Sequence, residues 1–194
     1  MTIDRWQHRW QKEFEDALKY KSGVILSNNV RDKYLYLPPG TTEGYELLGI
    51  SEYLVKFLRQ DFNTIKLYDP VDKIVDCSPR LQTASTSKKI ESSDRSERKI
   101  DQTETDDSPG GKGSIVDRDL VLIANELNAK DKCCFIMTFT DKTLPSKASS
   151  PDEQILLLRI EKMIQNMKPS NKLILLYISD DMITPDFYKN NPTV

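Results

Sequence analysis

The sequence predicts one α/β domain, a three-layer sandwich whose mostly parallel sheet has about four strands and follows an amphipathic N-terminal helix. The runs 133–140 and 172–178 are almost continuously apolar, so both faces of each strand must be covered. Helical patterns separate the predicted strands, which is typical of a parallel sheet whose right-handed crossovers place helices on both faces. A length of 194 residues fits a single domain.

The first half of the predicted domain, residues 1–77, contains two helix and strand pairs. Aromatic side chains recur at helical spacing near the start, and a short apolar run follows. Pro38-Pro39-Gly40 then interrupts regular structure, and Pro70 ends a segment of alternating polarity. The predicted elements are a helix at about 4–20, a strand at 24–26, a helix at about 45–60 and a strand at 64–69.

A polar insertion is predicted at 78–116. It contains no aromatic residue and is dominated by Ser, Thr, Lys, Glu and Asp. Such a segment cannot bury enough apolar surface to offset the entropy of ordering it. We therefore expect it to be disordered, and we expect about 80–114 to be dispensable for folding.

The second half of the same domain, residues 117–194, opens with a helix for which Asp117 is a suitable cap. Ser150 then precedes Pro151, and Glu153 is placed to complete a capping box. This signal predicts a helix that ends at about Met167. The two apolar runs described above supply the remaining strands.

Composition excludes several function classes. The chain has 28 basic and 30 acidic residues and a net charge of -2, so it offers no electrostatic footprint for nucleic acid or a membrane surface. The N-terminus lacks the apolar core of a secretion signal, and no apolar run approaches the length of a membrane span. We expect a cytoplasmic protein whose three cysteines are reduced, with Cys133 and Cys134 pointing to opposite faces of a strand.

Ligands of parallel sheets bind at the carboxyl ends of the strands. The loop after the first strand offers Asn28, Asn29, Arg31 and Asp32 as ligand-binding candidates, but it lacks the glycines and lysine of a phosphate-binding loop. We therefore expect no catalytic residues and no ATP hydrolysis by this chain alone.

A second set of candidates consists of acidic residues after the later strands. Asp69, Asp141 and Asp180 could converge on Mg²⁺, since hard cations prefer carboxylate oxygens. Lys142 stands where a nucleotide hydrolase would place a second acid. Helix caps and solvated turns explain these carboxylates more simply.

The N-terminal helix carries a third candidate site. Trp6, Trp10 and Phe14 form an aromatic stripe that either packs on the domain's own sheet or stays open as a partner surface. Aromatic stripes are more often core, and the partner surface is the alternative.

Three stretches, 23–32, 67–70 and 173–176 followed by 187–194, resemble the front region of bacterial AAA-family ATPases. The resemblance implies a non-catalytic, degenerate P-loop-like domain that regulates or assembles an AAA ATPase domain, in cis or in trans. It implies ATP and Mg only in that ATPase domain, and another copy of the chain is a further candidate partner. Asn28 departs from the glycine expected there, and the polar insertion is longer than the pattern. A magnesium-dependent phosphohydrolase and a nucleotide-sensing domain remain the alternatives.

Overall fold

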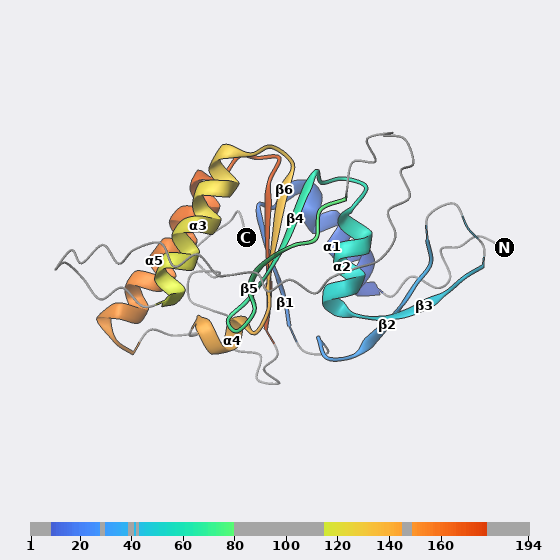
Figure 1. Ribbon diagram of the computed structural model, residues 1–194, viewed down its shortest axis with the longest axis horizontal. Coiled ribbons are helices and arrows are strands. Elements are labelled where there is room, and N and C mark those ends of the chain that lie inside the picture. The colour runs from blue at the N-terminus through green and yellow to red at the C-terminus, as the bar shows by residue number, and fades with distance from the viewer. Residues whose placement is uncertain are drawn as a thin grey trace, which may run out of the picture.

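The computed structural model describes residues 9–27, 30–38, 41, 43–79, 115–144 and 149–177. The main sheet has five strands and a separate ribbon has two. Figure 1 shows the main sheet between two layers of helices. The elements are α1 (Arg9–Tyr20), β1 (Gly23–Leu26), β2 (Lys33–Tyr36), β3 (Glu46–Gly49), α2 (Ile50–Leu58), β4 (Thr64–Asp69), β5 (Lys73–Asp76), α3 (Ile115–Ala129), β6 (Cys133–Met137), α4 (Thr140–Thr143), α5 (Pro151–Asn166) and β7 (Lys172–Leu176).

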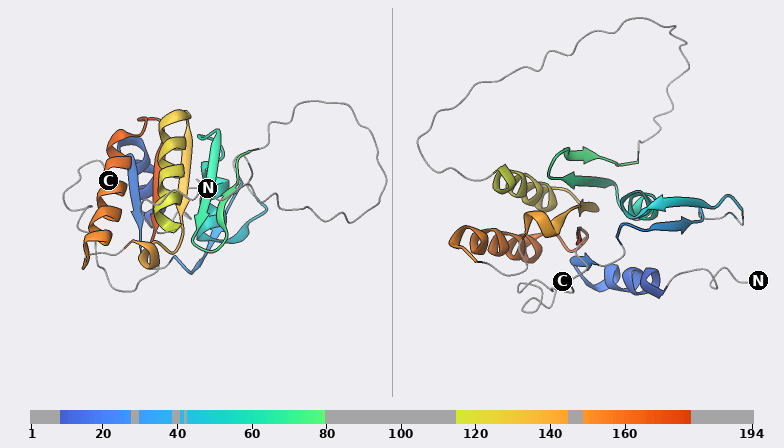
Figure 2. Two further views of the ribbon diagram at one scale, coloured as in Figure 1. Left: turned by 60° about the vertical axis from the view of Figure 1, so that its left-hand side comes forward. Right: turned by 90° about the horizontal axis from the view of Figure 1, so that it is seen from below.

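The sheet has the order β1-β7-β6-β4-β5, in which only β5 is antiparallel to its neighbour. The chain leaves β1, passes β7 and β6 to reach β4, and then returns one strand at a time through α3 and α5. Right-handed crossovers in opposite directions place their helices on opposite faces. Figure 2 shows α1 and α2 on one face and α3 and α5 on the other. The predicted α/β sandwich is therefore confirmed, with one strand more than expected.

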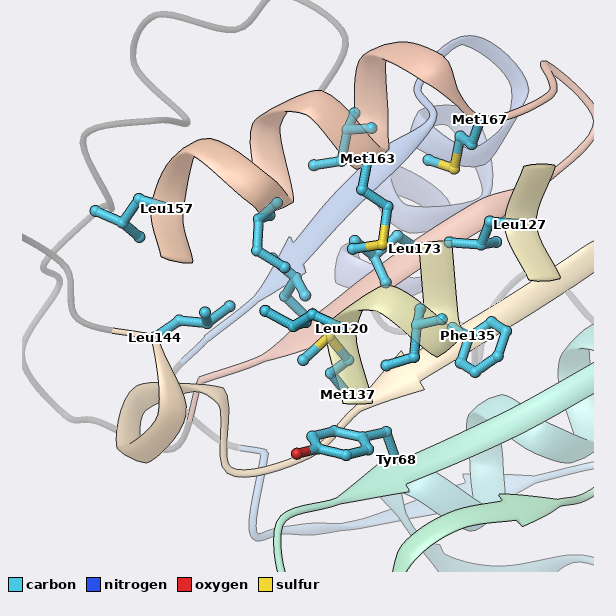
Figure 3. Close-up of a cluster of buried hydrophobic side chains, with 14 of the residues drawn as sticks. Tyr68, Leu120, Leu127, Phe135, Met137, Leu144, Leu157, Met163, Met167 and Leu173 are labelled. Carbon is cyan, nitrogen blue, oxygen red and sulfur yellow. The ribbon is translucent and has the colours of Figure 1, made fainter. Parts of the chain in front are cut away.

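Each face of the sheet has its own apolar core, and alternate residues of β6 divide between them. Cys133, Phe135 and Met137 pack toward α3 and α5, where Figure 3 shows Met163 of α5 directed at Leu173 of β7. Cys134 and Ile136 pack on the opposite side with α1 and α2. This confirms that the two neighbouring cysteines point to opposite faces, and all three cysteines are free.

The ribbon of β2 and β3 is the main departure from the predicted elements. The helix expected over about 45–60 begins only at Ile50, because 46–49 forms β3 and Gly49 caps α2 with extended backbone. Tyr45, Leu47 and Leu48 happen to share helical spacing with the apolar residues of α2. The ribbon packs one face on α2 and leaves Leu35 and Leu47, which are register partners, exposed on the other.

Several boundaries also differ from the predictions. The strand expected over 133–140 ends at Met137, because the chain turns at Phe139 into α4. α3 begins at Ile115 rather than at Asp117. Ser78, placed in the insertion, instead accepts a hydrogen bond at 3.0 Å from the backbone of Ile65. The expected disordered insertion otherwise falls on 80–114, outside the described residues.

The capping box of α5 is confirmed in full. The Ser150 hydroxyl accepts from the backbone N–H of Glu153, and the Glu153 carboxylate accepts from the backbone N–H of Ser150. The cap fixes where α5 starts, and therefore how the chain returns from β6 to β7 across the sheet.

Candidate functional site

The carboxyl ends of β1, β4, β6 and β7 meet at one edge of the sheet, which we call the carboxyl edge. The connection after β1 leads to the α2 face, whereas the connection after β6 leads to the α5 face. The carboxyl ends of the strands are where ligands of open α/β sheets bind. The described side chains at this edge are Ser27, Asp69, Thr138, Phe139, Thr140, Asp141, Lys142 and Tyr177.

Asp69 closes the turn between β4 and β5. Its Oδ1 accepts hydrogen bonds from the backbone N–H groups of Val71 at 2.8 Å and Asp72 at 3.3 Å, and its Oδ2 accepts from the Thr138 hydroxyl at 2.9 Å. Burial raises the pKa of Asp69, but the three hydrogen bonds outweigh it and hold the pKa below the ordinary value. Both oxygens of this metal candidate thus serve the turn and the neighbouring strand.

Asp141 lies in the short helix α4 beneath the end of β7. Its carboxylate is 10% exposed and lies 3.4 Å from the ammonium of Lys142. The hydroxyl of Tyr177 is buried, and none of the residues that the structure describes forms a hydrogen bond with it. Burial, followed by the charge of Asp141, raises the pKa of Tyr177 well above its ordinary range. The edge is therefore polar between β6 and β7, and Asp141 has a cation beside it.

Phe139 adopts a left-handed backbone conformation, with φ 48° and ψ 37°. For a residue other than glycine, this conformation costs about 1–2 kcal/mol. The turn is held by a hydrogen bond from the Lys142 N–H to the Phe139 carbonyl and by the buried Thr140 hydroxyl, which donates to the Met137 carbonyl. The ring of Phe139 remains 44% exposed at the carboxyl edge.

The structure brings together only part of the predicted sites. Arg31 and Asp32 are exposed in the turn before β2, while Asn28 and Asn29 lie outside the described residues. Asp69 and Asp141 share the carboxyl edge, and Asp180 also lies outside. Across the described ranges, no three His, Cys, Asp or Glu side chains are grouped as metal ligands would be.

The aromatic stripe of α1 packs mainly within the domain. Phe14 is 3% exposed, and the Trp10 ring, which is half-buried, contacts Tyr34 edge-on at 4.9 Å and Tyr53 at 5.6 Å between ring centroids. The buried Gln11 amide donates to the Tyr53 hydroxyl at 2.9 Å, which joins α1 to α2. Trp6 lies outside the described residues. The partner-surface prediction thus rests on Trp6 and on the open part of Trp10.

Sequence reasoning missed a surface on the outer side of α3 and α5. Four aliphatic side chains of these helices, Val121, Leu122, Ile155 and Leu158, are exposed, and Val121 lines a groove between the two helices. A signal existed: the runs 120–123 and 155–158 are each four apolar residues long, which is wider than the stripe a helix needs to cover a sheet.

In the part of the chain that the structure describes, no helix is long and apolar enough to cross a membrane. The family model for the N-terminal Rossmann-like domain of AAA+ chaperones matches residues 5–194. No curated protein and no solved structure matches the sequence. The match agrees with the α/β sandwich and with the resemblance to the front region of AAA-family ATPases, and it spans nearly the whole chain. The chain belongs to the family of N-terminal Rossmann-like domains of AAA+ chaperones.

Proposed function

We propose that this domain is a non-catalytic regulatory or assembly module of an AAA+ chaperone, and that it works on an ATPase domain in cis or in trans. The match to the N-terminal Rossmann-like domain of AAA+ chaperones supports a role beside an ATPase domain. ATP and Mg²⁺ would then be bound by the ATPase domain, and the present domain would act through contact.

The hydrogen bonds that the Asp69 carboxylate accepts are the main support for this proposal. A carboxylate that binds Mg²⁺ needs free oxygens directed at the ion. Both oxygens of Asp69 instead accept hydrogen bonds from the turn and from Thr138. The sequence after β1, Ser27 to Asp32, has neither glycine nor lysine to hold a phosphate. These features support a domain that does not turn over nucleotide.

Hydrolysis by the isolated chain tests the proposal. We expect no release of phosphate from ATP or GTP above a buffer blank in the presence of Mg²⁺, because no phosphate-binding loop is present and Lys142 replaces the second acid. We also expect that adding the chain to the AAA+ ATPase domain changes the turnover or the oligomeric size of that domain. Magnesium-dependent turnover that Asp141→Asn abolishes would establish the phosphohydrolase alternative instead.

A further inference from the structure

The ribbon of β2 and β3 lies beside α2 and has an edge that no described strand covers (Figure 1). β3 pairs with β2 on one side, and on its other side no backbone hydrogen bond joins it to another described segment. That edge presents unpaired N–H and C=O groups, which are a template for a further strand. A two-stranded ribbon is marginally stable alone, so a third strand would stabilise it.

A groove of about 430 Å³ runs along this edge of β3. Glu46 and Leu48, which point from β3 toward α2, line the groove, whereas no residue of β2 does. Val55 of α2, Leu67 of β4 and Cys77 supply the rest of its apolar lining. The groove thus continues the layer between the ribbon and α2 past the edge of β3. In a strand added at this edge, alternate side chains would enter the groove.

Two residues of α2 give the groove one charge of each sign. Glu52 lies in the first turn of α2 and Arg59 follows its last residue, and both are exposed. Within the described ranges neither forms an ion pair, whereas Lys56 of the same groove pairs with Glu46. Arg59 is seven positions after Glu52, which is about 10 Å along the helix. In an extended segment, side chains on one face and four residues apart are about 13 Å apart, so long charged side chains can reach both residues.

The outer face of the ribbon favours apolar neighbours. Leu35 and Leu47 are register partners on that face, and they are 37% and 66% exposed. A third strand would place one of its outward side chains beside Leu47, and an apolar residue at that position would cover it. The two faces of the ribbon therefore select a strand with apolar residues between two charged ones.

We infer that the free edge of β3 binds an extended segment of a partner protein, which adds to the ribbon as a third strand. The segment carries a cation and a carboxylate four residues apart, with apolar residues between them. Its cation pairs with Glu52, its carboxylate pairs with Arg59, and its central side chain lies on Val55. This binding does not depend on the regulatory role proposed above.

A second copy of the chain fits this edge less well. If β3 paired with β3 of another copy about a two-fold axis, both α2 helices would lie on the same side of the joined ribbon. Leu67 of β4 and Cys77 already border the groove on that side. A single extended segment meets no such obstruction, because only its side chains enter the groove.

Three peptides and two variants of the full chain test the inference. The first peptide has about seven residues, with a lysine and a glutamate four positions apart and three valines between them. The second carries N-methyl groups on the valines, which remove the backbone donors that strand pairing needs. The third has a second lysine in place of the glutamate. The variants are Arg59→Glu and the control Arg118→Glu, which changes an exposed arginine of α3 on the opposite face of the sheet. Circular dichroism verifies that both variants are folded, and calorimetric titration measures binding.

We expect the first peptide to bind the wild type and Arg118→Glu equally, and to bind Arg59→Glu about threefold or more weakly. The third peptide should instead prefer Arg59→Glu to the wild type. The N-methylated peptide should bind about tenfold or more weakly, because it cannot complete the backbone ladder. Hydrogen exchange should slow at 46–49 when the first peptide is bound, and not at 73–76 in β5.

Four results would each overturn the inference. They are no binding of the first peptide up to about 1 mM, equal binding of the N-methylated peptide, equal binding of the first peptide by Arg59→Glu, and slowed exchange at 73–76 in place of 46–49.

Discussion

Asn171 and Cys133 are joined by a buried hydrogen bond in which the backbone N–H of Cys133 donates to Oδ1 of Asn171 at 2.8 Å. The Nδ2 of Asn171 donates to the carbonyls of Leu127 at 2.6 Å and Lys130 at 2.8 Å. One side chain with no exposed surface therefore supplies hydrogen-bond partners for backbone groups at the end of α3 and at the start of β6. It also fixes β7, which begins at the next residue, against both elements.

Replacing Asn171 by Ala should reduce the free energy of unfolding by about 2–4 kcal/mol, because three backbone groups lose their partner and two of these hydrogen bonds are buried. Urea denaturation of both proteins measures the difference. Asn125→Ala is the matched control, since Asn125 is exposed on α3, and it should change stability by less than about 0.5 kcal/mol. Equal midpoints for the wild type and Asn171→Ala would contradict the assigned role.

Elements with a strong local sequence pattern were predicted correctly. The unbroken apolar runs of β6 and β7 and the Ser150 capping box needed no knowledge of the rest of the chain. The ribbon of β2 and β3 could not be separated from α2, because its apolar residues continue the helical spacing and only the extended backbone of Gly49 marks the change. β5 was also missed, since it is four residues long and starts at Lys73 with a φ of 65°.

The candidate site was less predictable than the fold, because it depends on contacts between residues that are far apart in the sequence. The carboxyl ends of the strands were located from sequence, since a parallel sheet collects them at one edge. The use of Asp69 was not, because its partner Thr138 is 69 residues away in the sequence. The groove between α3 and α5 depends on how two helices pack, which no pattern within either helix specifies.

The carboxylate of Asp69 should make stability depend on pH in the acid range. Its pKa in the folded domain lies below the ordinary value of 3.8, because the hydrogen bonds to the charged form outweigh the opposing effect of burial. A lowered folded pKa stabilises the domain above the unfolded value and loses that contribution as pH falls through the folded pKa. We therefore expect wild type to exceed Asp69→Asn by about 1 kcal/mol at pH 7, and the gap to shrink below about pH 4.

Urea denaturation of both proteins between pH 3 and pH 7 measures this gap. Asn keeps an oxygen that can accept from the turn but loses the acceptor for Thr138, so the change of the gap with pH, and not its size at pH 7, reports the charge. Asp72→Asn changes an exposed carboxylate in the same turn and should give no comparable gap at any pH. A gap between wild type and Asp69→Asn that is constant down to pH 3 would show that the charge of Asp69 is not held by these hydrogen bonds.

The three thiols should differ sharply in reactivity, because they differ in burial. Cys133 and Cys134 have no exposed surface, whereas Cys77 is half-buried after β5. Burial raises the pKa of Cys133 to about 11 and raises that of Cys134 further, so both remain protonated as well as inaccessible. In the native protein a disulfide reagent such as DTNB should therefore modify one thiol, that of Cys77.

The reaction of Cys77 should be slower than that of a free thiol, because burial also raises the pKa of Cys77. The other two should react only as the sheet opens, at a rate that increases with urea. Cys77→Ser should abolish the early phase and leave the late phase unchanged. Rapid modification of two or more thiols in the folded wild type would mean that β6 is more accessible than its position in the centre of the sheet allows.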